Sequence, residues 1–199
     1  MKGCCKLNII EKKYNWSGSL TKRAATKYIV LHHRAGNGDV DSIHQLHLKE
    51  GYTGIGYHFY IRKDGSVYRG RPINTVGAHC LGSNANSIGI CFEGNYTREE
   101  MPTAQIRAGQ ELIDSIKGVY FNLEVKKHSD LYNTACPGKN FPFKEVTTMP
   151  LKKPKDITLD EAITLIQTKA ELENETIEFL LCYKYGEDLI TKLAKAIRK

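Results

Sequence analysis

The segment that most restricts the fold is 87–93, Ser-Ile-Gly-Ile-Cys-Phe-Glu, which is nearly continuous in apolar residues. Such a run is typical of a strand buried on both faces in the middle of a sheet. A second β-rich segment, 27–31, ends at a pair of histidines, His32 and His33. Because a doubly buried strand needs cover on both sides, these two segments predict a sheet with helices on both faces.

Further strands are expected at 56–62 and 67–69, joined by a turn that contains the pair Asp64-Gly65. An Asp-Gly pair between two apolar stretches is a strong hairpin signal. Strands and helices therefore interleave, and the fold class we predict is α/β, with a central mixed sheet flanked by helices.

Two helices are expected between these strands. The first is capped by Asp41 or Ser42 and ends at Glu50, where Gly51 stops it. The second begins at Thr103 and should stop at Gly118. Its apolar stripe consists of Ile106, Gln110, Ile113 and Ile116.

The C-terminal part of the chain has a different character. A linker rich in Pro and Lys is expected over 149–156, between an α/β domain at 1–148 and a helical module at 157–199. Thr158 and Glu161 fit a capping box at the start of the first helix of this module. Two or three amphipathic helices are too few for a large core. We therefore expect the module to dock on the first domain or to form a homo-oligomer with a copy of itself.

Charge and hydropathy indicate which classes of molecule this protein is expected to bind. The 199 residues carry a formal net charge of +7, which favours polyanionic partners in general. No nucleic-acid-binding motif is recognisable, so we predict no nucleic-acid partner. No apolar run is long enough for stable membrane insertion, and the N-terminal stretch lacks the apolar segment of a secretory signal. Synthesis in the cytoplasm is the expectation that follows.

Two histidines and one cysteine suggest a metal site. His32 ends the first core strand, and Cys136 follows His128 by eight residues. Imidazole and thiolate are the donors that zinc prefers, and a catalytic zinc has three protein ligands and one open position. The spacing alone is a weak signal. Without a secretory signal the six cysteines are not expected to form disulfides.

Five ordered stretches resemble the zinc amidases that include the amidase-type lysozymes of phages and the peptidoglycan recognition proteins of animals. The resemblance covers about 25–145, whereas the last 50 residues are only weakly similar to helical tails of some clostridial phage amidases. The matching stretches are 28–33, 51–59, 76–79, 86–90 and 128–138.

The resemblance implies one Zn²⁺ per chain, held by His32, His128 and Cys136. Relatives with Ser in place of the cysteine generally bind peptidoglycan without cutting it, so Cys136 favours an enzyme. Tyr57 matches the family's catalytic tyrosine. Thr134 stands where the phage enzymes have Lys and the animal enzymes have Thr, and a hydroxyl there donates a hydrogen bond without adding charge.

Other residues have weaker assignments. His79 and Asn86 match positions in the substrate groove, so substrate contact is expected from both. Some relatives have a catalytic Glu where Cys91 stands, and Glu93 is a weaker candidate for that role.

Arg71 and Tyr132 are interpreted as surface residues. His33 should face away from His32, because neighbouring strand residues point to opposite faces.

The implied activity is N-acetylmuramoyl-L-alanine amidase, which cuts the bond between N-acetylmuramic acid and L-alanine in bacterial peptidoglycan. The implied setting is a phage or prophage endolysin that reaches the cell wall through a holin-type hole, with the tail aiding wall targeting or assembly. A cytosolic recycling amidase fits the tail less well. Two alternatives stay open: a non-catalytic peptidoglycan-binding module, and a Cys-His hydrolase with Cys136 as nucleophile.

Overall fold

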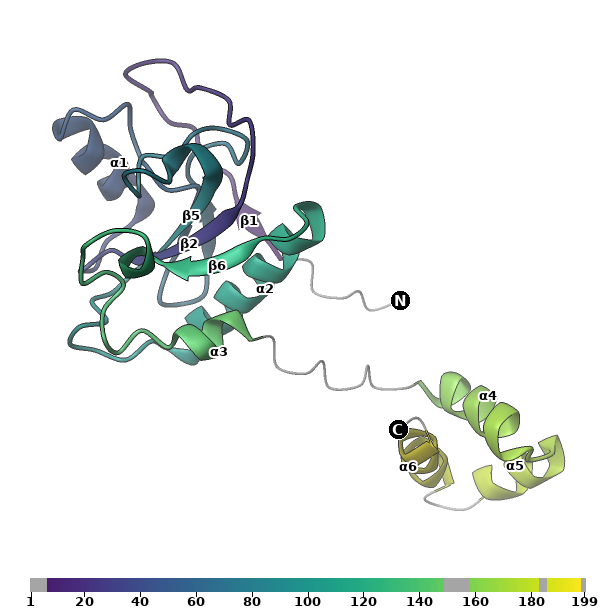
Figure 1. Ribbon diagram of the computed structural model, residues 1–199. Coiled ribbons are helices and arrows are strands. Elements are labelled where there is room, and N and C mark those ends of the chain that lie inside the picture. Colours follow the sequence, from purple (N-terminus) through teal and green to yellow (C-terminus); the bar gives the residue numbers. More distant parts are fainter. Residues whose placement is uncertain (1–6, 149–157, 183–185, 198–199) are drawn as a thin grey trace. The chain divides into compact units, whose positions relative to one another are not determined.

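The computed structural model describes residues 7–148, 158–182 and 186–197 (Figure 1). The chain divides into two compact units, Met1–Met149 and Pro150–Lys199. The linker expected over 149–156 lies outside the described residues. No helix in the described ranges is long and apolar enough to cross a bilayer.

A six-stranded sheet forms the centre of the first unit, with strand order β1-β4-β3-β5-β2-β6. Only β3 and β4 pair antiparallel, and every other neighbouring pair is parallel. The prediction of a central mixed sheet with flanking helices is confirmed. The strands are β1 (Ile9–Ile10), β2 (Tyr28–His33), β3 (Phe59–Ile61), β4 (Val67–Arg69), β5 (Ser87–Phe92) and β6 (Glu124–Lys127).

Strand β5 is buried along its whole length between β3 and β2, as its apolar run predicts. Alternate residues face opposite sides of the sheet. Ile88, Ile90 and Phe92 pack in the larger core cluster, whereas Cys91 belongs to a second cluster on the other side. His32 is paired with Cys91 in the register and shares its side of the sheet.

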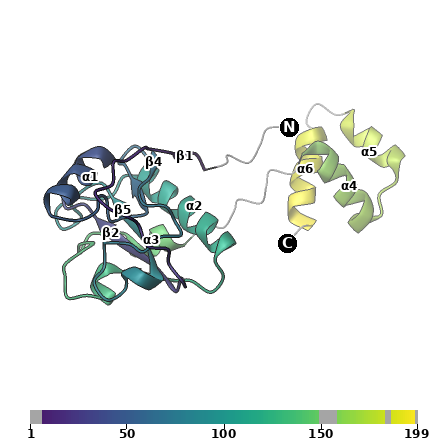
Figure 2. The same ribbon diagram turned by 90° about the horizontal axis from the view of Figure 1, so that it is seen from above.

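Helices cover both faces of the sheet (Figures 1 and 2). Helix α1 (Val40–Lys49) packs Val40 and Ile43 into the same cluster as Cys91. Helix α2 (Thr103–Val119) and α3 (Phe143–Thr147) cover the opposite face. Two short 3₁₀ turns, η1 (Asn84–Asn86) and η2 (His128–Asp130), flank the strands that lead to the site.

Helix ends differ from the sequence prediction. The α1 cap is Asp39, whose carboxylate accepts a hydrogen bond from the amide of Ser42 at 2.8 Å, rather than Asp41 or Ser42. Helix α2 continues through Gly118, so the predicted stop at that glycine was wrong. Ile113 and Ile116 are buried as expected, whereas the expected stripe residues Ile106 and Gln110 are only half-buried. Gln105, Ala108, Gly109 and Leu112 supply the remaining buried positions of α2.

The second unit contains helices α4 (Leu159–Ala170), α5 (Asn174–Leu181) and α6 (Gly186–Ile197). The predicted capping box is present, because Thr158 and Glu161 bond to each other's backbone amides. The core of this unit is small. Its buried members are Ala162, Ile166, Ile177, Ile190 and Ala194.

Candidate functional site

His32, His128 and Cys136 converge at one edge of the sheet. One potential ligand atom from each lies within 4.8 Å of the other two. Strands β2 and β6 run parallel, so the residues at their carboxyl ends meet at the same edge. His32 is the last residue but one of β2, and His128 directly follows β6. Their ring centroids are therefore only 4.4 Å apart.

The loop from His128 to Cys136 is folded back on itself by its own backbone. The amide of Ser129 donates to the carbonyl of Cys136 at 2.9 Å, and the amide of Tyr132 donates to the carbonyl of His128 at 3.0 Å. These bonds set the second and third donors side by side. The Cys136 sulfur lies 3.8 Å from Nδ1 of His32.

The protonation states of the two imidazoles suit a metal. Burial lowers the pKa of His32 well below its usual value, and the neighbouring His128 and His33 lower it further. Burial also lowers the pKa of His128. Both rings are therefore neutral at neutral pH, with a lone pair available for coordination. Burial raises the pKa of the Cys136 thiol to about 11.

The donor set fits zinc. Two imidazoles and one thiolate leave a fourth tetrahedral position open, as in catalytic zinc sites. Among the described residues, Nε2 of His128 is a buried ring nitrogen without a hydrogen-bond partner. A buried polar atom without a partner is costly unless something outside the protein satisfies it. The donor set and the unpartnered nitrogen of His128 are therefore consistent with a zinc site.

A groove of about 380 Å³ has one of these three residues, His128, in its wall. Tyr57 lines it, with its ring centroid 5.1 Å from that of His32. Burial raises the pKa of Tyr57 well above its usual value, and Cys91 and Cys136 raise it further, so its hydroxyl stays protonated and is a donor. The groove residues are His47, Glu50, Tyr52, Tyr57, Ala78, His79, Cys80, Leu81, Asn84, His128 and Tyr132.

The two predicted substrate contacts occupy different places. His79 lines the groove, although its side chain is largely buried and Nδ1 lies 3.0 Å from Nε2 of His32. Asn86 does not line the groove; it ends η1, and its carbonyl accepts a hydrogen bond from the amide of Lys27. Asn84 lines the groove instead. Thr134 is held close to the site, where its hydroxyl accepts a hydrogen bond from the amide of Cys136 at 3.2 Å.

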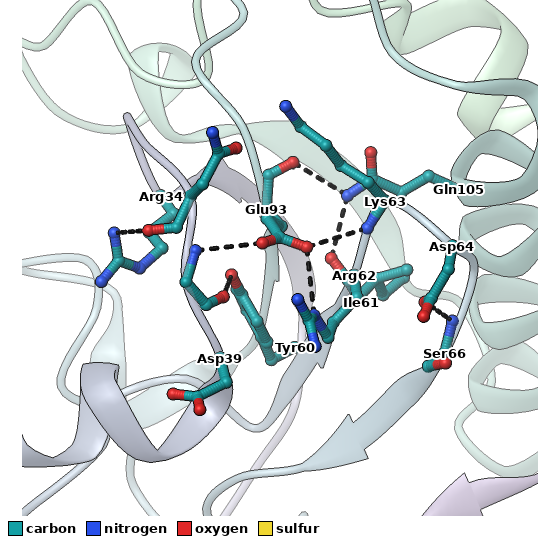
Figure 3. A network of polar contacts seen from close by, with 12 residues as sticks. Arg34, Asp39, Tyr60, Ile61, Arg62, Lys63, Asp64, Ser66, Glu93 and Gln105 are labelled. Atoms are coloured by element: carbon teal, nitrogen blue, oxygen red, sulfur yellow. Dashed lines mark hydrogen bonds and ion pairs between the residues drawn. The ribbon is translucent and has the colours of Figure 1, made fainter.

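Glu93 is not placed to act as a base (Figure 3). Its carboxylate accepts bonds from the amides of Gly38 and Lys63 at 3.0 and 3.1 Å, and from Nε of Arg62 at 3.2 Å. The side chain is only 4% exposed and does not line the groove. The carboxylate oxygens of Glu93 thus accept bonds that link the segment before α1 to the β3–β4 turn. The catalytic role suggested from the sequence is not supported.

Arg71 was wrongly interpreted as a surface residue. It is 5% exposed, and its guanidinium donates to the carbonyls of Ile55 and Val76 and to the hydroxyl of Thr53. These three bonds hold together the loops on either side of the groove. A charged residue gives no sign in the sequence that backbone carbonyls will surround it.

Three exposed residues on the groove rim were not identified as site residues from the sequence. Leu81 is 71% exposed, and Tyr52 and Tyr132 are each nearly half exposed. Tyr132 stacks on His128, with ring centroids 5.7 Å apart. The sequence offered two signals of a role in the site. Leu81 stands two residues after His79, and Tyr52 lies within a stretch that matches the family. Large exposed apolar groups beside a polar groove are typical of a ligand-contact surface.

This chain is similar to several known proteins. A family model described as N-acetylmuramoyl-L-alanine amidase matches residues 22–139. The endolysin of Klebsiella phage KP32 is 35% identical over 59% of this chain and 83% of that protein. Peptidoglycan-recognition protein SC2 of Drosophila melanogaster is 35% identical over 66% of this chain and 81% of that protein.

A solved structure extends the comparison to the backbone. The endolysin amidase LysCS from Clostridium intestinale is 41% identical to this chain and superposes with a TM-score of 0.68. The superposition covers 70% of this chain and 92% of that one.

Proposed function

We propose that this chain, which belongs to the N-acetylmuramoyl-L-alanine amidase family, hydrolyses the amide between N-acetylmuramic acid and L-alanine in peptidoglycan. The observation that carries the proposal is the convergence of His32, His128 and Cys136 within 4.8 Å of one another. These residues would hold one Zn²⁺ per chain, beside a groove open to a polymeric substrate.

A zinc ion held by these residues would supply Lewis acidity for polarising the scissile carbonyl and for activating water near neutral pH. The protein's part is to position donors around the reacting amide. The protonated hydroxyl of Tyr57 is a hydrogen-bond donor at the groove wall, suited to the oxygen that gains negative charge. Thr134 supplies a second hydroxyl near Cys136. Its oxygen accepts a hydrogen bond from the amide of Cys136, which leaves its hydrogen available to donate.

The groove suits a muramyl peptide. Leu81, Tyr52 and Tyr132 present apolar and aromatic surface, against which sugar rings or an alanine side chain can pack. Substrate contact by His79 and Asn86 remains a prediction. The net charge of +7 would favour approach to an anionic wall.

A Cys-His hydrolase with Cys136 as nucleophile is less well supported. Such enzymes lower the pKa of the thiol with a nearby positive charge. Here burial raises the pKa of Cys136 to about 11, and neutral imidazoles surround it. A non-catalytic binding module is disfavoured by the complete set of three donors.

Digestion of purified peptidoglycan, with mass spectrometry of the products, tests the proposal. We expect new free N-terminal alanine and unmodified muramic acid lactyl groups, loss of both after chelation, and recovery on adding Zn²⁺. Activity that survives metal removal, or cleavage at another bond, would contradict the proposal. Binding to peptidoglycan without any released product would favour the binding module.

The cellular setting follows from the relatives. Since several of them are phage endolysins, we infer that the chain acts on the cell wall after release from the cytoplasm through a holin-type hole. The second unit would then target the wall or join copies of the chain. Its small core and the exposed apolar residues Leu189, Leu193 and Ile197, spaced by four along α6, support a contact with another surface.

A further inference from the structure

Two buried histidines meet nitrogen to nitrogen beneath the proposed metal site. Nε2 of His32 lies 3.0 Å from Nδ1 of His79, and the two side chains are 1% and 8% exposed. A neutral imidazole carries one N–H donor and one bare acceptor nitrogen. In this pair one ring must therefore donate and the other accept, and their surroundings decide which does so.

The contact on the far side of His79 favours one direction. The hydroxyl of Ser87, which is fully buried, donates its single hydrogen to the carbonyl of Ser83 at 2.6 Å. Its oxygen can then only accept from Nε2 of His79, 3.5 Å away. With the proton on Nε2, Nδ1 of His79 is bare and accepts from His32 Nε2–H. Nδ1 of His32 is left with its lone pair, on the side where the Cys136 sulfur lies at 3.8 Å.

Two glycines make room for the His79 ring. If either Gly77 or Gly89 were alanine, its Cβ would lie 2.5 Å from Cδ2 of His79. The two glycines therefore form a slot for the imidazole. The amides of His79 and Cys80 both donate to Oδ1 of Asn84 at 2.8 Å, which fixes the backbone under the ring. The slot holds the plane of the ring, and the contacts with His32 and Ser87 distinguish its two edges.

We propose that His79 is a positioning residue for the metal ligand His32. It holds His32 in the tautomer with the proton on Nε2, so that the lone pair of Nδ1 is directed at the metal. Ligating histidines commonly donate their second nitrogen to a carboxylate or carbonyl, and here a second histidine, oriented by Ser87, takes that place. The inference rests on the proposed zinc site. It also changes the role expected of His79, because both ring nitrogens are used inside the protein and only a carbon edge remains for substrate.

Nitrogen NMR of the metal-free protein labelled at histidine tests the tautomer directly. Long-range proton–nitrogen correlations report which ring nitrogen carries the proton, and we expect Nε2 for both His32 and His79. A proton on Nδ1 of His32 would overturn the proposal. Because no zinc is needed, this measurement stays decisive even if the proposed function fails.

Zinc affinity, measured by competition with a chromophoric chelator, tests the consequence. His79→Phe keeps a flat ring but removes the acceptor, and we expect zinc binding about 10- to 100-fold weaker. His79→Asn places a carbonyl oxygen near the former Nδ1 and should restore most of the affinity. Leu81→Ala, in the same loop but without contact to His32, is the matched control and should bind as the wild type does.

The outcomes separate the two proposals. If the wild type binds zinc and His79→Phe binds it equally well, the positioning role is wrong while the metal site stands. If the wild type takes no zinc, the proposed function fails. Should His79→Phe not fold, Ser87→Ala serves in its place. We expect that variant to show a mixture of His79 tautomers and weaker zinc binding, and an unchanged tautomer with unchanged affinity would contradict the proposal.

Discussion

The backbone amide of His33 donates a hydrogen bond to the sulfur of Cys136 at 3.4 Å, across 103 residues of sequence. The third proposed ligand is thereby anchored to the strand that carries the first. A sulfur that accepts an amide hydrogen is also stabilised as the thiolate that a metal requires. The two ends of the proposed site are therefore linked before any ion binds.

This link leads to a prediction for Cys136→Ser. The serine oxygen can still accept the amide of His33, so the fold should persist. Zinc content should fall from one per chain to a small fraction, because a neutral hydroxyl is a poor zinc ligand compared with a thiolate. Metal analysis and a peptidoglycan turbidity assay would measure both losses, with Cys182→Ser, an exposed cysteine of the second unit, as control. Full zinc content in Cys136→Ser would refute the assignment of this ligand.

Tyr57→Phe separates catalysis from metal binding. Only the hydroxyl is removed, and the ring packing against His32 and His79 is kept. We expect unchanged zinc content and a kcat about 100- to 1000-fold lower, the usual cost of losing one donor to the reacting oxygen. Tyr52→Phe on the groove rim is the control. Turnover equal to the wild type would exclude a catalytic role for Tyr57.

Glu93→Gln should destabilise the protein in a pH-dependent way. Burial alone would raise the pKa of this carboxyl, but the amides of Gly38 and Lys63 and the side chain of Arg62 outweigh it and hold the pKa below its ordinary 4.5. The charged form therefore stabilises the fold fully above about pH 4.5, and this contribution is lost as the pH falls through the folded-state pKa.

At neutral pH we expect Glu93→Gln to lower the free energy of unfolding by about 2–3 kcal/mol, since a charged acceptor is lost at a buried position. The difference from the wild type should shrink as the pH falls below 4.5. Urea denaturation at several pH values would measure it. Glu111→Gln, on the exposed side of α2, should show no such dependence, and a constant deficit at all pH values for Glu93→Gln would contradict the role given to its charge.

Removal of residues 150–199 should leave the chemistry intact. The sheet, the groove and the three proposed ligands all belong to the first unit, which has its own core. We expect unchanged cleavage of soluble muropeptides, together with a change in lysis of whole cells or in sedimentation coefficient. If neither changes, the targeting or assembly role of the second unit is wrong.

The sequence predicted the interior of the fold better than its edges. Strands β5 and β2 were recognisable because burial on both faces demands an unbroken apolar run. Strand β6, Glu-Val-Lys-Lys, was not predicted, because an edge strand exposed to solvent has little apolar pattern. The stop predicted at Gly118 was wrong because a glycine at an exposed helix end weakens the helix without having to end it, and α2 continues to Val119.

The residues of the site were likewise predicted only in part. His32, His128 and Cys136 were proposed from the resemblance, since their spacing alone says little, and the structure brings them together. Strand alternation alone predicted that His33 faces away, and it accepts the amide of Tyr96 on the opposite side. Neither Arg71 nor Glu93 was interpreted correctly, because their partners are mostly backbone groups from other loops.

Strand β6 forms one edge of the sheet, and among the described residues it pairs with β2 alone. Two of the three proposed donors follow this strand, so a strand that is paired on one side alone leads to most of the proposed metal site. A brief detachment of that margin would separate those donors from His32 while the remaining sheet stays folded. An ion that binds only the closed form suppresses the detachment by mass action. Resistance of residues 123–139 to proteases should therefore rise with metal occupancy, even under conditions where the whole domain is far from melting.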